Sequence, residues 1–179
     1  MSRPVHIDAL TGLQGTTRAR LIDIETEAFS HPWSLSDFDF MMANPQAVNL
    51  ALWRGEELAG YAMGLVESGD LHVVSLAVVE AHRRAGWGTR LVEELMRRAA
   101  SRGCRLCRLE VRRSNRAAQA LYKRCGFGAA GVAPGYYTHP AEDALLLERP
   151  IDRAVSVPVP TAAEMSESPG PNSRFPAAT

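Results

Sequence analysis

The sequence lacks any long apolar run, and neither sign of charge is in excess. No window of the 179 residues approaches the roughly 20 apolar residues that a helix needs to cross a bilayer. The N-terminal stretch MSRPVHIDAL has no apolar core of the kind found in secretory signals. Twenty basic residues balance twenty acidic ones, which gives no support to binding of nucleic acid or a membrane surface. These absences predict a cytoplasmic protein without a nucleic-acid or membrane partner.

Cysteine is also scarce. The chain has three cysteines, and this odd number without an export signal favours reduced thiols over disulfides. Cys104 and Cys107 form a single C-x-x-C pair on an expected strand, where residues three apart point to opposite faces. Because no second pair completes a zinc site, we expect no metal centre.

The spacing of the apolar residues predicts an α/β domain. Strands are expected at residues 5–9, 48–53, 58–66, 71–79, 104–111, 127–132 and 144–148. Helices are expected at residues 17–29, 34–42, 89–101 and 115–124. Ser34 followed three residues later by Asp37 is a start signal for the second helix. The segment PGYY at 134–137 is expected to form a turn region between the last two strands. This order predicts a mixed sheet with helices on its faces.

The composition changes near residue 151. Beyond that point the chain has five prolines, no periodicity and little apolar surface to bury. The sequence therefore predicts one domain over residues 1–151 and a disordered tail, rich in Pro, Ser and Ala, over 152–179.

The stretch RRAGWG at 83–88 is the most informative part of the sequence. It lies between the apolar run at 71–79 and the amphipathic pattern at 89–101. Glycines let the main chain approach a phosphate, and the N–H groups and dipole of a helix start favour an anion. The stretch matches neither the nucleotide P-loop nor the Rossmann motif. It indicates a ligand that carries phosphate, with an ordinary tight turn as the alternative.

The chain resembles a known enzyme family over roughly residues 20–151, less strongly before residue 70. The motif R-x-x-G-x-G after an apolar strand resembles the pyrophosphate loop of the GCN5-related N-acetyltransferases (GNAT). Residues 75–127, which include LEVRRSNRAAQALYKRCGF, are similar without a gap to the RimI-type ribosomal-protein-alanine N-acetyltransferases, and GYY followed by EDALLL is similar to their closing hairpin. The resemblance implies an α/β (α+β) fold of GNAT type. Its mixed, mostly antiparallel central sheet would have about seven strands, flanked by about four helices.

The resemblance also implies a co-substrate and its contacts. Acetyl-CoA would bind through its pantetheine arm to main-chain groups of Leu76, Ala77 and Val78. The implied pyrophosphate contacts are the main-chain amides of Arg84, Ala85, Gly86, Trp87, Gly88 and Thr89. Trp87 departs from the usual small aliphatic residue. Asn115 matches a cofactor-contacting asparagine, and it is equally suited to cap the helix that follows.

Two residues match the family's catalytic positions. Glu110 corresponds to the general base; the alternative is a strand glutamate that faces water. Tyr122 corresponds to the general acid, which would donate a proton or a hydrogen bond to the departing thiolate; the alternative is core packing. A free α-amine has a pKa of roughly 7.7–8.0 and a lysine about 10.4, so a modest base suits an N-terminus better. No cysteine matches a nucleophile position, which favours direct attack by the amine.

The implied acceptor is a protein N-terminus, namely the alanine exposed on the eighteenth small-subunit ribosomal protein. Trp33, Tyr136 and Tyr137 occupy places where the family shapes its peptide groove, although packing within the fold is an equal alternative. Two other functions stay open: acetylation of a small-molecule amine, and non-catalytic binding of an acyl-CoA.

Overall fold

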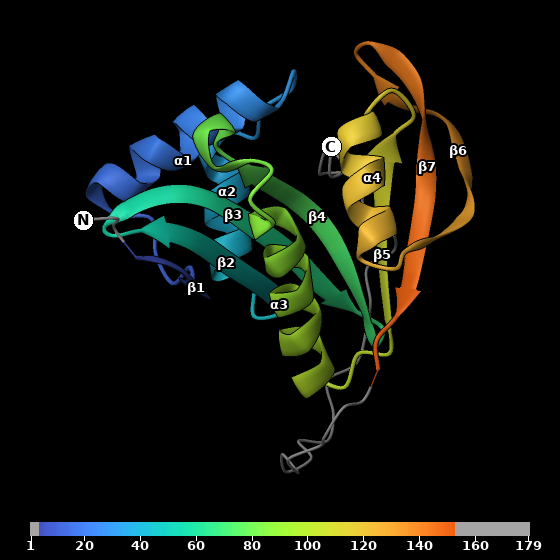
Figure 1. Ribbon diagram of the computed structural model, residues 1–179, viewed down its shortest axis with the longest axis horizontal. Helices are drawn as coiled ribbons and strands as arrows, with labels where there is room; N and C mark the ends of the chain where they lie inside the picture. The colour runs from blue at the N-terminus through green and yellow to red at the C-terminus, as the bar shows by residue number, and fades with distance from the viewer. Residues whose placement is uncertain (1–3, 153–179) are drawn as a thin grey trace.

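One seven-stranded sheet runs through the protein in the order β1-β2-β3-β4-β5-β7-β6 (Figure 1). The computed structural model describes residues 4–152. The elements are β1 (Val5–Ala9), α1 (Gly15–Ala28), α2 (Leu35–Ala43), β2 (Ala47–Arg54), β3 (Glu57–Glu67), β4 (Asp70–Val78), η1 (Glu80–His82), α3 (Trp87–Ser101), β5 (Leu106–Arg112), α4 (Arg116–Arg124), β6 (Gly128–Thr138) and β7 (Ala141–Pro150). Neighbouring strands are antiparallel except β4 and β5, which are parallel. This confirms the expected mixed, mostly antiparallel sheet.

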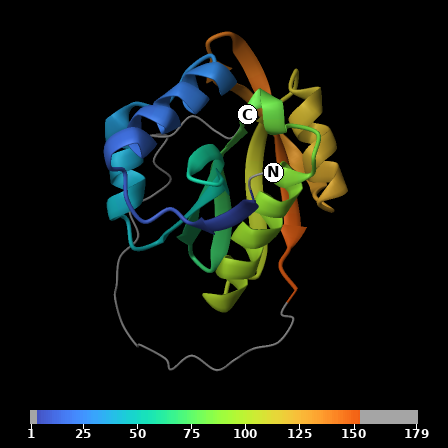
Figure 2. The same ribbon diagram turned by 60° about the vertical axis from the view of Figure 1, so that its left-hand side comes forward.

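The helices cover both faces of the sheet. Figure 2 shows α1 and α2 on one side of the strands and α3 and α4 on the other. The expected start signal of α2 is confirmed, because Ser34 and Asp37 form a reciprocal capping box. In α3 the apolar stripe of Leu91, Leu95 and Ala99 is buried, as its periodicity predicts. Strands β3 and β4 are therefore covered on both faces and form the centre of the core.

Strands β4 and β5 pair over only part of their length and then diverge. Their ladder has three residue pairs and stops at His72 and Arg108, although β4 continues to Val78 and β5 to Arg112. The register of β4 against β3 shifts at the same level and leaves Val74 as the extra residue of a β-bulge. A bulge bends the strand that carries it, and Figure 1 shows β4 and β5 diverging beyond this point. The C-terminal half of β4 is thus left with one edge that no described strand pairs.

The prediction for the last hairpin is wrong in one respect. The segment 134–137 lies within β6, and the turn falls at His139–Pro140, which are joined by a cis bond. The register of β6 against β7 shifts between Ala133 and Tyr137, so residues 134–136 bulge out of the ladder. The side chain of Asp143 accepts the backbone N–H of Gly135 at 2.9 Å and holds this bulge. Proline is tolerated there because a bulge requires no ladder donor.

The strand expected at 104–111 begins later than predicted. Cys104 precedes β5, and its N–H donates to the carbonyl of Ala99 at the end of α3. The argument that Cys104 and Cys107 face opposite sides of one strand therefore does not apply, and both thiols are buried. Within residues 4–152, no three potential metal ligands cluster, and no helix is both long and apolar enough to cross a membrane. Almost all of the predicted tail lies outside the described residues.

Candidate active site

The loop between β4 and α3 presents main-chain amides at a helix start. Gly86 caps α3 with φ of +83°, a left-handed conformation that favours glycine. No side chain caps this end of the helix, and its first turn holds no acidic residue. The first amides of a helix have no partner within it, so those of Trp87, Gly88 and Thr89 are oriented for an anion. Arg83 and Arg84 are exposed beside them. The loop fits a pyrophosphate group.

Three contacts hold this loop in place. Arg83 donates from Nε to the carbonyl of Val78 at 2.8 Å, which ties the loop to the end of β4. Gly88 is the point of closest packing, because a Cβ there would collide with the side chain of Leu121 on α4 and touch Leu76. The guanidinium of Arg90 lies 4.7 Å from the ring centroid of Trp87. The loop, the end of β4 and the start of α3 therefore form one unit with α4.

The predicted pantetheine segment lies on the open half of β4. Leu76, Ala77 and Val78 pair on one side with β3, at Ala62, Tyr61 and Gly60. On the other side the ladder with β5 has already ended. This edge is the place where an extended ligand would pair with main-chain groups, as an added strand does.

Glu110 lies on β5, just past the end of the β4–β5 ladder. Burial alternates along β5, with Cys107, Leu109 and Val111 buried and Glu110 on the half-exposed face. The Glu110 side chain is 15% exposed, and its Oε2 lies 2.6 Å from Nε2 of His72. Glu110 is therefore not a strand glutamate free in water. It is paired with an imidazole at the point where the two strands separate.

Sequence reasoning missed His72. It is a histidine inside a mostly apolar strand, and that irregularity was the available signal. Its partner lies 38 residues away, so only the parallel pairing of β4 with β5 brings the two side chains together.

Tyr136 and Tyr137 lie near the same carboxylate. Their rings meet edge to face at 5.2 Å between centroids. Tyr136 is exposed, and Tyr137 is buried. Burial, and then the charge of Glu110, raise the pKa of Tyr136 to about 12. The hydroxyl of Tyr137 is buried without a hydrogen-bond partner among the described residues. Such a group costs free energy unless a ligand or water pairs with it.

Arg112, two residues after Glu110, contacts Tyr137 and the hairpin turn. Its guanidinium lies 3.9 Å from the ring centroid of Tyr137. It donates to the carbonyls of His139 and Pro140 at 3.2 and 3.3 Å, and it pairs with Glu142 at 3.3 Å. A planar guanidinium makes all these contacts at once, which an ammonium cannot do. Sequence reasoning also missed this role.

The α1–α2 loop reaches the same turn. The ring of His31 in this loop lies 5.5 Å from the ring of His139, measured between centroids. Trp33, in contrast, is only 3% exposed, and its ring packs against Phe38 at 5.3 Å. The structure brings the loop and the hairpin together, and it places the Trp33 ring in the core.

For two further candidates the structure shows contacts within the fold. Asn115 caps α4, because its Oδ1 accepts the N–H of Ala118 at 3.0 Å. Tyr122 is 1% exposed and packs edge to face on Phe127, with 5.6 Å between centroids. Burial raises the pKa of Tyr122 above its ordinary value.

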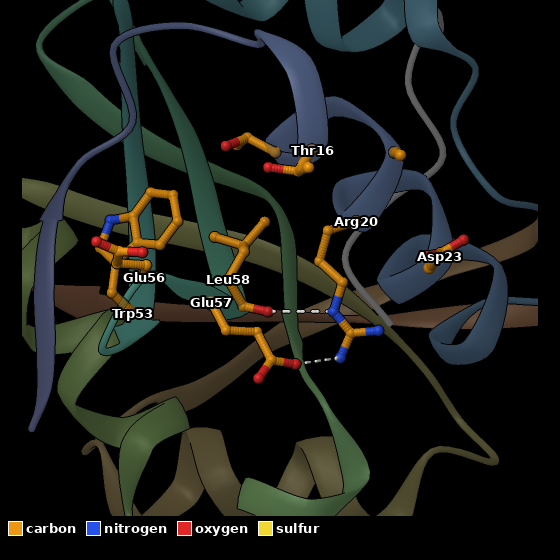
Figure 3. Close-up of a pocket in the computed structure, with 9 residues that line it drawn as sticks. Thr16, Arg20, Asp23, Trp53, Glu56, Glu57 and Leu58 are labelled. Carbon is orange, nitrogen blue, oxygen red and sulfur yellow. Dashed lines mark hydrogen bonds and ion pairs between the residues drawn. The ribbon is translucent and has the colours of Figure 1, made fainter. Parts of the chain in front are cut away.

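A separate hollow lies between α1 and the β2–β3 hairpin (Figure 3). Arg20 spans it, donating to the carbonyl of Leu58 at 3.3 Å and pairing with Glu57 at 3.4 Å. None of the candidate residues above lines this hollow. They lie instead around the place where β4 and β5 diverge, which we call the opening between these strands.

Comparison with known proteins shows which family the chain resembles. The Acetyltransferase (GNAT) family profile matches residues 18–127. The ribosomal protein bS18-alanine N-acetyltransferase of Escherichia coli K12 is 31% identical over 147 residues, which are 81% of this chain and 99% of that protein. N-alpha-acetyltransferase RimI of Mycobacterium tuberculosis is 32% identical over 154 residues, 83% of this chain and 94% of that one.

The fold agrees with these relatives. The crystal structure of the ribosomal-protein-S18-alanine N-acetyltransferase from Escherichia coli matches with a TM-score of 0.74 at 30% identity. It covers 87% of this chain and 99% of that one.

Proposed function

Because the chain belongs to the GNAT family of acetyltransferases, we propose that it acetylates the α-amine of a protein N-terminus. The enzyme is an acetyl-CoA-dependent N-acetyltransferase, and its relatives are RimI-type enzymes. The proposed acceptor is the N-terminal alanine of the ribosomal protein bS18, which the name of the Escherichia coli relative specifies for that protein.

The observation that carries this proposal is the Glu110–His72 pair at the opening between β4 and β5. An amine must be neutral to attack a thioester, and its proton must leave as the bond forms. Glu110 is the proposed base, either directly or through a water molecule. His72, whose Nε2 lies 2.6 Å from the carboxylate, orients it. An α-amine with a pKa of roughly 7.7–8.0 needs only a base of this modest strength.

The two sides of the opening suit the two substrates. The unpaired edge of β4 and the amides at the start of α3 would hold the pantetheine and pyrophosphate of acetyl-CoA. The unpaired hydroxyl of Tyr137 would bond a polar group of the peptide, with Tyr136 as the exposed wall beside it. Burial, and to a smaller extent the charge of Glu110, raise the pKa of both tyrosines, so the carboxylate and the two phenols share one region of the structure.

Tyr122 is the proposed donor to the leaving thiolate. Its high pKa favours the protonated phenol, which is the form that donates. By bulk values a phenol near pKa 10 does not fully transfer its proton to a thiolate near 8.5. A hydrogen bond that strengthens as negative charge develops on sulfur is the better description of its role.

The test is acetyl transfer from acetyl-CoA to a peptide library with varied first residues, read by mass spectrometry. A peptide with the N-terminus of mature bS18 is expected to react, and polyamines and aminoglycosides are expected not to react. Acetylation of the small amines alone would replace the proposal with the small-molecule alternative.

The residue roles are tested in the same assay. Glu110→Gln is expected to lower kcat/KM by about 10²- to 10⁴-fold, the usual contribution of general base catalysis. Glu67→Gln, an exposed strand glutamate on β3, is the matched control and should leave it unchanged. Tyr122→Phe is expected to lower kcat much more than it raises KM. Wild-type turnover in Tyr122→Phe would leave Tyr122 as a packing residue.

A further inference from the structure

A buried carboxylate, Glu25, lies in the last turn of α1, outside the site described above. Its side chain is 1% exposed. Burying a carboxylate is unfavourable unless its oxygens accept hydrogen bonds, so its partners show what it holds. Oε1 accepts the backbone N–H of Trp33 at 2.9 Å, and Oε2 accepts the hydroxyl of Tyr61.

The network continues from Tyr61 on β3 to Ser75 on β4. The Tyr61 hydroxyl lies 2.9 Å from Oγ of Ser75, and both residues are buried. Ser75 directly follows the bulge in β4 and directly precedes Leu76, where the segment assigned to acetyl-CoA begins. A continuous chain of buried hydrogen bonds therefore joins the α1–α2 loop to that segment.

The loop at the other end of this chain borders the proposed peptide site. His31 contacts His139 of the β6–β7 turn, and the Trp33 ring is anchored on Phe38. Since Glu25 bonds the main chain at Trp33, its carboxylate determines where this loop lies relative to β4.

We propose that Glu25 is a positioning residue that fixes the α1–α2 loop at the Trp33 amide and, through Tyr61 and Ser75, sets the spacing between the peptide side and the acetyl-CoA side. The role rests on the proposed function, because it concerns how the acceptor peptide is held. Glu25 itself touches neither substrate and takes no part in the proton transfer.

Steady-state kinetics with the reactive peptide give the first test. Glu25→Ala is expected to raise the peptide KM about tenfold, as for the loss of a hydrogen bond to a charged group, with kcat within about twofold. Glu25→Gln keeps an oxygen for the Trp33 amide and should restore the peptide KM to within about twofold of wild type. Glu27→Ala, at an exposed glutamate on the same helix, is the control and should have no effect.

Hydrogen exchange read by mass spectrometry tests the same role without acetyl transfer. In Glu25→Ala, amides at residues 29–34 should exchange faster, while those of β5 keep their wild-type rates. A wild-type enzyme that transfers no acetyl to any peptide would overturn the proposed function, and faster exchange in this loop would still support the anchor. Unchanged exchange in the loop, or equal increases in the KM for peptide and acetyl-CoA, would overturn the anchor.

Tyr61→Phe provides a second variant in case Glu25→Ala does not fold. It removes one hydroxyl from the network and keeps the buried ring. The peptide KM should rise and the loop should exchange faster, in the same direction as for Glu25→Ala. Wild-type values of both quantities in Tyr61→Phe would contradict the proposed connection to β4.

Discussion

The two sides of the opening between β4 and β5 are built by different means. On the β4 side the candidate groups are main-chain amides and carbonyls, set by a bulge at Val74 and a left-handed glycine at 86. On the β5 side they are side chains, and each is held by another side chain or by a turn from a distant part of the sequence. A main-chain site depends on the path of the backbone, and a side-chain site depends on every partner. A substitution that pushes the β4 backbone out of place should therefore damage the main-chain site. Removal of a single side chain should damage the side-chain site.

Removal of His72 is expected to have the largest effect of the four changes below. His72→Ala leaves Glu110 without the imidazole at 2.6 Å. Hydrogen bonds to charged groups are worth about 1.5–3 kcal/mol, so kcat should fall about 10- to 100-fold. The measurement is kcat with both substrates saturating, and His6→Ala, an exposed histidine on β1, is the control. A kcat within about twofold of wild type would show that Glu110 acts without this partner.

A bulkier residue packed against β4 should weaken the binding of acetyl-CoA. A Cβ at Gly60 would lie 2.7 Å from the carbonyl oxygen of Ala77 and 3.2 Å from Cα of Val78, both backbone atoms of the proposed acetyl-CoA segment. Overpacking of this kind costs about 1–3 kcal/mol, so Gly60→Ala should lower the Tm and weaken CoA binding about tenfold.

Calorimetric titration of CoA checks this prediction. Gly12→Ala serves as the control, since a Cβ at Gly12 meets nothing within 4 Å. A lower Tm with unchanged CoA affinity would mean that the edge of β4 does not bind the ligand.

Arg112→Lys should affect the peptide alone. Lysine keeps the charge but loses the planar group that stacks on Tyr137 and bonds the turn carbonyls. A cation–π contact is worth about 0.5–2 kcal/mol, so the peptide KM should rise about 2- to 30-fold. CoA affinity should not change. Arg113→Lys, at the exposed neighbour paired with Asp143, is the control. Equal losses for both substrates would contradict the division between the two sides.

The last prediction concerns stability. Glu25 is buried and is linked by hydrogen bonds both to the α1–α2 loop and to β4. Burial raises the pKa of Glu25 from 4.5 to about 6; bonds from Tyr61 and the Trp33 amide lower it, and the charge of Asp37 raises it. Because the folded pKa is the higher one, stabilisation by the protonated carboxyl is complete below pH 4.5 and is lost as the pH rises through about 6. At 1.36 kcal/mol per pKa unit the loss is about 2 kcal/mol.

Urea unfolding of wild type and Glu25→Gln at pH 4.5 and 7 measures this difference. The free energy of unfolding should fall with rising pH by about 2 kcal/mol more in wild type than in the variant. Equal changes in the two proteins would contradict the raised pKa.

Much of the fold and one side of the site were predictable from sequence. The capping box at Ser34 and the amphipathic stripe of α3 are local signals. The stretch RRAGWG is contiguous, so its glycines and arginines mark the main-chain side without knowledge of any distant contact. Glu110 and the two tyrosines were found through the family resemblance and not through spacing.

The contacts between side chains on the β5 side of the opening were not predictable in the same way. His72 and Glu110 are 38 residues apart, and the contact of Arg112 with Tyr137 requires the register of β5, β7 and β6. The expected turn at 134–137 was wrong because the Asp143 side chain holds those residues as a bulge in β6. The Trp33 ring is buried against Phe38, which fits the packing alternative that the sequence left open.

By itself, the sequence determined which segments become helices and strands and where main-chain amides gather at the start of α3. These outcomes depend on apolar periodicity and on glycine conformation, which act over a few neighbouring residues. Only the tertiary structure decided that β4 leaves β5 beyond His72 and which side chains meet at that opening. The register between distant strands and the competition for buried space are properties of the whole packed chain.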